Sequence, residues 1–460
     1  MSEVTRILII GGGVAGYPAA IWASRMGAAV TLIEKDAIGG TCLNWGCIPT
    51  KALLQSASVV RTMKSAETFG IRCHGYDVDF GAVMKRKDSV VSRLTRGVGA
   101  LLKAGKINVV QGTATFVDSK TVQVNETGVK IRADAILIAT GSKPGSIPVE
   151  GIDGPDVMDS KQALSLTSLP ASVVVIGGGV IGVEFAQFLA AMGTRVTILE
   201  MMPGLVPGVD REVASLLEKR TIMSGIDVVT GASVKGIARM GAHNVVTYTV
   251  GDKTATASAE KILLTVGRRP DFSLIDLERT GVRHENGAIV VDEHMQTNIP
   301  GIYAAGDVVG GIMLAHLASA EGECAVKNIL GTREAMSYRA VPSCIYTSPE
   351  VASVGLTEEK AALSHDIRVG RFPFRANGKA VVLNELEGLV KIISESSSGE
   401  VLGVHIIGPH ATDLIAEAVL GMHKKMTAGD FAHTIHPHPT LSEAIMEAAM
   451  TLTGGAIHVP

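Results

Sequence analysis

Residues 6–34 read RILIIGGGVAGYPAAIWASRMGAAVTLIE, and this stretch decides the fold. An apolar run, a turn of glycines and an alanine-rich segment follow one another, which predicts a strand, a tight turn and a helix to about Met26. A second apolar run from Ala29 ends at Glu34, an acid that lies 23 positions after Gly11, the first glycine of the turn. Strand, glycine turn, helix and terminal acid together predict a β-α-β unit that binds a dinucleotide.

The same arrangement recurs at residues 172–200, which read SVVVIGGGVIGVEFAQFLAAMGTRVTILE. Here the acid is Glu200, again 23 positions after the first glycine of its turn, Gly177. A single glycine pattern is weak evidence in a chain with 52 glycines, but finding the full arrangement twice makes coincidence improbable. We therefore expect two Rossmann-like nucleotide-binding domains, each built on a parallel sheet.

The composition of the whole chain narrows the classes of protein to which it can belong. A length of 460 residues predicts two to four domains, and 46% hydrophobic and 19% charged residues are typical of an α/β protein. A net charge of -3 argues against a surface for nucleic acid or anionic membrane. Five scattered cysteines do not suit a secreted disulfide framework and favour a reducing cytoplasm. The uncharged stretch 7–24 is long enough to mimic a membrane span, but its glycines favour strand, turn and helix.

Residues 39–51, GGTCLNWGCIPTK, hold two cysteines just after the first acid. A disulfide between Cys42 and Cys47 closes a short loop, and a strained, accessible disulfide is easier to reduce than a structural one. Pro49 fits just inside the start of a helix, whose N-terminus favours a thiolate. Beside a bound flavin or nicotinamide, such a pair can receive or deliver two electrons. Two packed, unbonded cysteines are the alternative.

The last motif is residues 436–443, HPHPTLSE. Oxidation of a dithiol requires a base near neutral pH, and histidine suits that task. Glu443 lies five residues after His438 and can orient its ring, although the letters TLSE also match a helix capping box. A metal site made of His433, His436 and His438 is a further alternative. We expect no metal, because no cysteine or acid is placed to complete the ligand shell.

Together these motifs resemble the pyridine nucleotide-disulfide oxidoreductases, over essentially the whole chain. The resemblance is carried by the two glycine turns, the cysteine run, Ala139-Thr140-Gly141, Gly306-Asp307 and the histidine motif. It implies an α/β fold with two Rossmann-like domains, for FAD and NAD, and a C-terminal α+β dimerisation domain. The expected boundaries are 1–145 for the first part of the FAD-binding domain, 146–268 for the NAD-binding domain, 269–340 for the second part of the FAD/central domain and 341–460 for the dimerisation domain.

Within the family, the chain is similar to the branch that oxidises dihydrolipoamide, and this implies roles for the catalytic residues. Cys42 exchanges with the substrate dithiol and Cys47 faces the flavin. Lys51 and Glu184 form an ion pair near the flavin and the nicotinamide, with solvated surface charges as the alternative. His438 of the last motif is the base, and the partner subunit of a homodimer supplies it.

The resemblance also implies the cofactor contacts. On the FAD side, Glu34 accepts hydrogen bonds from the adenosine ribose, and Asp307 binds the ribityl chain unless it is only a turn residue. Glu200 favours NAD over NADP, because a carboxylate repels a 2′-phosphate and residues 201–204 offer no arginine. The expected contacts on the FAD side are Gly11, Gly13, Gly16, Glu34, Lys35, Gly40, Thr41, Lys51, Ala114, Thr140, Gly141, Ser142, Asp307, Met313, Leu314, Ala315 and His316. Those on the NAD side are Gly177, Gly179, Val180, Ile181, Gly182, Glu200, Val234 and Gly267.

The implied function is oxidation of protein-bound dihydrolipoamide to lipoamide with NAD+, through FAD and the cysteine pair. An NADH-dependent reductase of another small-molecule disulfide is the closest alternative, and a flavin-bearing protein without turnover is a more distant one. The expected partners are a second copy of the chain and the lipoyl domain of a 2-oxo acid dehydrogenase or related multienzyme complex. We expect no nucleic acid, membrane or metal as a partner, and a cytoplasmic location.

Overall fold

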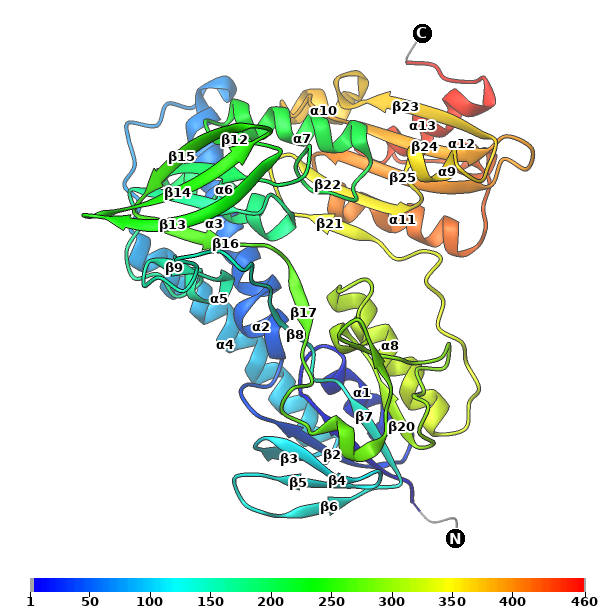
Figure 1. The fold of residues 1–460 in the computed structure, drawn as a ribbon. Helices are drawn as coiled ribbons and strands as arrows, with labels where there is room; N and C mark the ends of the chain where they lie inside the picture. Colours follow the sequence, from blue (N-terminus) through cyan, green and yellow to red (C-terminus); the bar gives the residue numbers. More distant parts are fainter. Residues whose placement is uncertain (1–3, 459–460) are drawn as a thin grey trace.

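A computed structural model describes residues 4–458, which form three bodies, each built around a five-stranded sheet (Figure 1). Two of the sheets are parallel and one is antiparallel, so the expected fold class is confirmed. The outer ends of the first and last expected domains, residues 1–3 and 459–460, lie outside the described residues. Within residues 4–458, no helix has both the length and the apolar character needed to cross a bilayer.

The first body, at the bottom of Figure 1, contains the first glycine turn. Its strands are parallel, and the central ones are buried on both faces, which explains their continuous apolar sequences. In spatial order they are β20 (Ile302–Ala304), β7 (Ala135–Ile138), β1 (Arg6–Ile10), β2 (Ala29–Glu34) and β3 (Asn108–Gln111). Helices α1 (Gly16–Arg25) and α8 (Ala315–Ile329) pack on this sheet through one shared apolar core. Strand β20 follows the second body in the sequence. The chain therefore leaves the first body, forms the second, and then returns to add the last strand of the first sheet.

The second body repeats this architecture around the second glycine turn. The register repeats as well, since Arg6 pairs with Ala29 in the first sheet and Ser172 with Arg195 in the second. The strands, in spatial order, are β12 (Asp227–Val229), β11 (Arg195–Leu199), β10 (Ser172–Ile176), β16 (Lys261–Leu264) and β9 (Val157–Met158), with helices α6 (Val180–Met192), α5 (Ser160–Ala163) and α7 (Arg211–Met223). Three-stranded antiparallel sheets accompany both bodies: β4 (Ala114–Asp118), β5 (Thr121–Val124) and β6 (Lys130–Arg132), and β13 (Ala232–Met240), β14 (His243–Val250) and β15 (Lys253–Ala259).

The third body is an antiparallel sheet covered by helices, at the upper right of Figure 1. Its strands, in spatial order, are β21 (Ser343–Ile345), β22 (Glu350–Gly355), β25 (Val401–Gly408), β24 (Leu389–Glu395) and β23 (Ile367–Pro373). Its helices are α9 (Glu358–Ala361), α10 (Gly378–Leu383), α11 (Ala411–His423), α12 (Ala428–His433) and α13 (Glu443–Thr453). The last of these helices, α13, begins at Glu443, at the end of the histidine motif.

Two kinds of connection place the cysteine run between the parallel sheets. Helix α3 (Cys47–Ser65) packs on α6 through buried residues such as Leu53 and Ala57, and α4 (Phe80–Ala104) runs beside it (Figure 1). Strands β8 (Ser142–Pro144) and β17 (Arg268–Pro270) pair as an antiparallel ribbon where the chain passes from the first body to the second and back. The domain boundaries expected at 145 and 268 fall on this ribbon, and we retain them as a prediction.

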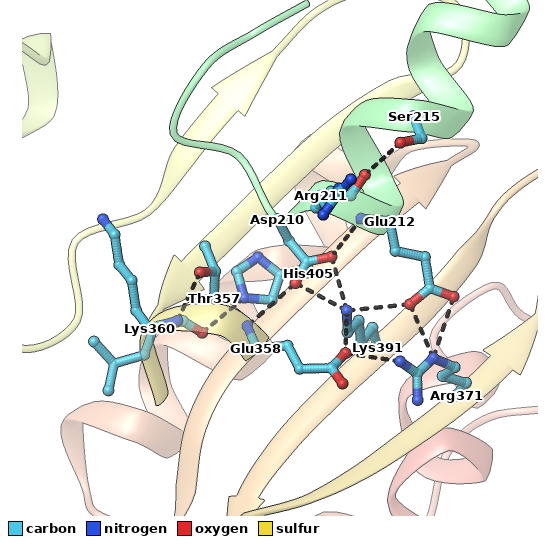
Figure 2. A network of polar contacts seen from close by, with 11 residues as sticks. Asp210, Arg211, Glu212, Ser215, Thr357, Glu358, Lys360, Arg371, Lys391 and His405 are labelled. Atoms are coloured by element: carbon cyan, nitrogen blue, oxygen red, sulfur yellow. Dashed lines mark hydrogen bonds and ion pairs between the residues drawn. The ribbon is translucent and has the colours of Figure 1, made fainter. Parts of the chain in front are cut away.

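A buried ion cluster joins the second body to the third (Figure 2). Lys391 Nζ, on β24, lies 2.8 Å from Asp210 Oδ1, 3.1 Å from Glu212 Oε2 and 2.7 Å from Glu358 Oε2. The side chains of Lys391 and Asp210 are 1% and 0% exposed. Asp210 is also the N-cap of α7 and accepts a hydrogen bond from the backbone N–H of Glu358. Each buried charge is therefore paired, and the cluster fixes the start of α7 against the antiparallel sheet.

Replacing the buried cation should destabilise the protein far more than replacing an exposed one. We expect Lys391→Met to lower the free energy of unfolding by about 3–5 kcal/mol, because Asp210 remains buried without its cation. Arg371 is the matched control, since it pairs with the same Glu212 and Glu358 but is 41% exposed. Arg371→Met should cost at most about 1 kcal/mol. Equilibrium urea unfolding measures both values, and equal losses would contradict the assignment.

Candidate active site

A large cavity lies where the two parallel sheets meet the start of the antiparallel sheet. Its volume is about 1820 Å³. Pockets for single small molecules usually span about 300–1,000 Å³, so this one has room for more than one ligand. Its walls come from both glycine turns, the cysteine run, the β8–β17 ribbon and the start of α8. All expected cofactor contacts line the cavity except Gly16 and Gly182, which lie behind the turns.

Both glycine turns are crowded behind, where the helix meets the turn, and the second turn is open in front. A Cβ atom at Gly16 would lie 1.8 Å from the Gly11 carbonyl oxygen, and one at Gly182 would lie 2.0 Å from that of Gly177. Gly16 and Gly182 therefore let helix and turn meet closely, and their expected contact with a cofactor stays a prediction. In front, no described atom lies within 4 Å of a Cβ built at Gly179. This open backbone at a helix N-terminus suits a pyrophosphate.

An unpaired polar atom marks the first half of the cavity as a site for a ligand. Thr140 Oγ1 is buried and has no hydrogen-bond partner within residues 4–458. Buried hydroxyl groups are nearly always paired, so an orphan in a cavity wall indicates a group that is to be bound there. The cavity, the open turn and this hydroxyl all fit a dinucleotide cofactor.

The acids at the two strand ends are held in the same way. Glu34 accepts hydrogen bonds from the backbone N–H groups of Gly12 (2.6 Å) and Asp36 (2.7 Å). Glu200 accepts the equivalent bonds from Gly178 (2.5 Å) and Met202 (2.7 Å). Both carboxylates are thereby fixed beside a glycine turn. Each oxygen keeps a free lone pair for a further donor.

The cysteines stand on two helices rather than on one helix start. Cys42 lies in α2 (Gly40–Trp45), and Cys47 is the first residue of α3. Gly46 breaks the helix between them with φ -144 and ψ -112. A Cβ at Gly46 would lie 2.8 Å from the Thr41 carbonyl oxygen, so only glycine fits this close turn. The break places both thiols on the same cavity wall.

A hydrogen bond between the two thiols separates their pKa values. It raises the pKa of Cys42 far above its ordinary value, and burial adds to that effect. The same hydrogen bond lowers the pKa of Cys47 to about 7, and the charge of Lys51 lowers it further. Near neutral pH, Cys47 therefore carries much of the negative charge of the pair, while Cys42 keeps its proton. A pair of thiols with such different pKa values suits thiol–disulfide exchange.

Lys51 and Glu184 meet in this cavity. Lys51 Nζ lies 2.8 Å from Glu184 Oε2 and 3.0 Å from Oε1. The Glu184 side chain is 3% exposed, so the alternative of a solvated surface charge is wrong for it. Tyr346, directly after β21, donates its backbone N–H to Glu184 at 2.9 Å, and the centre of its ring lies 4.7 Å from Lys51 Nζ. The third body thus helps to hold the ion pair.

The histidine motif lies on the third body, outside the cavity. His438 Nδ1 is 2.9 Å from Glu443 Oε1, and the His438 side chain is 78% exposed. Glu443 Oε2 accepts the backbone N–H of Thr440 at 2.8 Å, so one carboxylate serves both the ring and the turn before α13. The Thr440 hydroxyl donates to the carbonyl oxygen of Pro437, and within the described residues it accepts no hydrogen bond from the backbone N–H of Glu443, so only half of the capping box is formed.

The other histidines of this segment have partners of their own. His436 is buried beside Glu417, with 2.9 Å between Nε2 and Oε1, and this ion pair raises the pKa of His436. His433 Nδ1 lies 2.8 Å from the carbonyl oxygen of Gly429. Among residues 4–458, no group of three or more possible ligands is arranged to hold a metal ion.

Sequence patterns do not predict the contacts of two residues of the cavity wall, Arg268 and Tyr346. Asp307 begins a short 3-10 helix (Asp307–Val309) and accepts a hydrogen bond from Ser142 Oγ, and Arg268 donates to the same hydroxyl. Arg268 follows the expected contact Gly267, but its strand gives no sign that the side chain turns inward. The contacts of Tyr346 cannot be predicted from sequence patterns either, because its partners lie 162 or more positions away.

Comparisons with known proteins agree with this geometry. The model of the family "Pyridine nucleotide-disulphide oxidoreductase" matches residues 5–322, and that of its dimerisation domain matches residues 341–449. A Bacillus subtilis dihydrolipoyl dehydrogenase is 43% identical over 98% of this chain and 99% of its own, and one from Geobacillus stearothermophilus is 42% identical over 99% and 97%.

Solved structures give the same result. LpdA from Mycobacterium tuberculosis is 30% identical, with a TM-score of 0.91 over 98% of this chain and 100% of its own. A Cu(II) complex of the HOCl-induced flavoprotein disulfide reductase RclA from Escherichia coli is 29% identical, with a TM-score of 0.88 over 98% and 99%. The chain therefore belongs to the pyridine nucleotide-disulphide oxidoreductase family.

Proposed function

We propose that this protein oxidises dihydrolipoamide to lipoamide with NAD+, through FAD and a Cys42–Cys47 disulfide. The observation that carries the proposal is the cysteine pair, whose pKa values are driven apart in a cavity shared by two glycine turns. The dihydrolipoyl dehydrogenases among its full-length relatives support lipoamide as the substrate.

Because their pKa values differ, the two cysteines take different roles in thiol–disulfide exchange. In the oxidised protein, a substrate thiolate attacks Cys42 Sγ, the bond between the two cysteine sulfurs breaks, and its electron pair leaves on Cys47. A low thiol pKa makes Cys47 the better leaving group. The second substrate sulfur then attacks the sulfur bound to Cys42, which closes the lipoamide ring. Cys42 leaves as a thiolate and takes up the proton of that second thiol, because its pKa is raised.

The proton of the first substrate thiol needs a separate acceptor, and we assign it to His438. The Glu443 carboxylate orients the ring through Nδ1, which leaves Nε2 free for the proton. Within one chain, this pair lies on the third body and outside the cavity. We therefore propose that His438 of the partner subunit completes each site in a homodimer, in keeping with the dimerisation domain of the family. The 95% exposure of Ile435, just before the motif, supports a contact surface at this place.

The two cofactors have distinct places in the cavity. The first glycine turn, Glu34, Thr140 and Asp307 would hold FAD, and the second turn, Glu200, Val234 and Gly267 would hold NAD. When bound, FAD accepts two electrons from the dithiol and passes them to NAD+ as hydride. The N-terminus of α8, near Leu314 and Ala315, favours negative charge at its end of the cavity. The Lys51 cation does the same beside Cys47.

We propose two further features of the setting. The expected partner is the lipoyl domain of a 2-oxo acid dehydrogenase or related multienzyme complex, because such a domain carries the dithiol to be oxidised. A cytoplasmic location suits a chain whose few cysteines include a pair that must cycle between thiol and disulfide.

Glu200 should set the choice of nicotinamide cofactor. We expect Glu200→Ala to reduce the preference for NAD+ over NADP+ by about 10–100-fold, because it removes both a hydrogen-bond acceptor for the 2′-hydroxyl and the repulsion of a 2′-phosphate. The ratio of kcat/KM values for the two cofactors measures this preference. Glu34→Ala, the equivalent change in the first unit, is the control and should weaken FAD binding without altering the ratio. An unchanged ratio in Glu200→Ala would refute its role.

Stopped-flow kinetics test the proposed substrate. We expect dihydrolipoamide to reduce the enzyme at least about tenfold more efficiently than other small dithiols, because specific recognition of a substrate is worth a few kcal/mol. The reverse reaction, with NADH and a panel of small disulfides, tests the alternative. If another disulfide is reduced more efficiently than lipoamide, the protein is an NADH-dependent reductase of that disulfide instead.

A further inference from the structure

Arg268 lies where three parts of the cavity wall meet. It is the first residue of β17 and pairs with Pro144 of β8 in the ribbon between the two parallel bodies. Its Nη2 donates to the Ser142 carbonyl oxygen at 2.7 Å, and its Nε donates to Ser142 Oγ at 2.8 Å. Nη2 also reaches Thr41 Oγ1 at 3.5 Å, and Nε lies 3.9 Å from Asp307 Oδ2. The side chain is only 17% exposed.

These contacts connect Asp307, which is expected to bind FAD, with the helices that carry the cysteines. The Ser142 hydroxyl accepts from Arg268 and donates to Asp307, so a continuous chain of hydrogen bonds runs from the guanidinium to that carboxylate. On its other side, the guanidinium reaches Thr41, the residue directly before Cys42. The planar fork of an arginine can hold several acceptors in fixed directions, which a lysine cannot.

The charge of Arg268 also needs partners, and the charged groups that attract it within the described residues all line the cavity. Burial lowers the pKa of Arg268, while the attraction of Asp307, Cys47 and Asp159 opposes that shift. A buried cation is costly unless it is paired and hydrogen-bonded. Because the ribbon needs only its backbone pairing, a smaller or neutral side chain would serve it equally well. The buried guanidinium therefore points to a role in the site.

We propose that Arg268 is a positioning residue, which fixes the distance between Asp307, through Ser142, and the cysteine-bearing helices, through Thr41. A flavin bound at Asp307 is thereby kept within reach of Cys47. The inference rests on the proposed function only in that it places FAD at Asp307. The inference adds Arg268 to the residues on the flavin side of the site. This residue lies on β17, where the chain returns from the second body to the first.

Three variants of the full-length holoenzyme test this inference. Arg268→Gln removes the cation, and Arg268→Lys keeps the charge without the fork. Arg269→Gln is the matched control, because Arg269 is the next residue of the same ribbon but is exposed and bonds only the Ser146 carbonyl within the described chain. Two quantities are measured: the Kd of the apoprotein for FAD, and the long-wavelength absorbance of a thiolate beside oxidised flavin after reduction by two electrons with dithionite.

We expect Arg268→Gln to raise the Kd for FAD by about 10–100-fold, since hydrogen bonds to charged groups are lost. It should also remove most of the long-wavelength absorbance, even at saturating FAD. Arg268→Lys should recover most of the affinity, because the attraction to Asp307 remains, but little of the absorbance, because the link to Thr41 is lost. Arg269→Gln should stay within about twofold of the wild type in both measurements.

Two results would overturn the inference. One is a normal Kd and a normal absorbance in Arg268→Gln, and the other is an equal loss in Arg268→Gln and Arg269→Gln, which would indicate a structural effect on the ribbon. Neither readout uses dihydrolipoamide. A wild-type enzyme that binds FAD but does not react with dihydrolipoamide would therefore contradict the proposed substrate and leave the test of Arg268 intact.

Discussion

Cys42→Ser and Cys47→Ser should each lower the oxidation of dihydrolipoamide by at least about 10⁴-fold, because residues that act as one catalytic unit fail together. Neither variant can form the disulfide that receives the electrons. FAD should stay bound in both, since its expected contacts are the first glycine turn, Thr140 and Asp307, and a serine fills nearly the volume of a cysteine. Turnover assays and the ratio of flavin to protein absorbance measure the two effects.

The two variants should differ in their spectra. Cys42→Ser keeps the Cys47 thiolate beside the flavin and should show long-wavelength absorbance without added reductant, whereas Cys47→Ser should show none. The pKa of Cys47 is lowered to about 7, and a thiolate is the form present above the pKa. The absorbance of Cys42→Ser should therefore appear as the pH rises through about 7. Absorbance in Cys47→Ser alone would reverse the roles assigned to the two cysteines.

A third variant tests why this pKa is low. The hydrogen bond from Cys42 is the largest cause of the shift, and a serine hydroxyl can replace it. Cys42→Ala removes the donor altogether. Its absorbance should appear at a higher pH than that of Cys42→Ser. Equal midpoints in the two variants would assign the low pKa to Lys51 and the helix N-terminus instead.

His438→Gln should slow the oxidation of dihydrolipoamide by about 10²–10⁴-fold, the usual range for loss of a general base. Reduction of the enzyme by NADH should be nearly unaffected, because that half of the reaction does not use the substrate dithiol. This separation between the two half-reactions distinguishes a lost base from a general disturbance of the fold. Rapid-mixing measurements of each half-reaction provide the test.

Mixed dimers show whether the base acts across the subunit interface. A dimer of one Cys47→Ser chain and one His438→Gln chain has one site with both cysteines intact and the partner's His438 in place. Random reassociation makes half of the dimers mixed, so an equal mixture of two inactive variants should recover about a quarter of wild-type activity. Cys42→Ser mixed with Cys47→Ser is the control and should recover none. If mixed dimers form and stay inactive, His438 does not act in trans.

The local motifs of this chain were predictable, because each depends on residues close in sequence. The glycine turns with their acids, the cysteine pair and the alternation of strand and helix follow from short-range patterns. The break at Gly46 was not predictable, since it depends on the close approach of the Thr41 carbonyl. Nor was the turn before α13, where the Thr440 hydroxyl donates to the Pro437 carbonyl oxygen.

The contacts that unite the site lie beyond the reach of such patterns. Arg268 meets Ser142 across 126 positions and Thr41 across 227, and Tyr346 meets Glu184 across 162. Local sequence carries no sign of which distant residues a fold will bring together. The Lys51–Glu184 pair spans 133 positions and was expected only from the family resemblance.

Stepwise anaerobic reduction of the wild-type holoenzyme with dithionite, followed by absorbance, tests most directly whether the sulfur pair and the flavin form one redox centre. The first two electrons should reduce the disulfide and produce long-wavelength absorbance while the flavin stays oxidised, and only further electrons should bleach the flavin. Bleaching by the first two electrons, with no long-wavelength absorbance at any stage, would contradict this account.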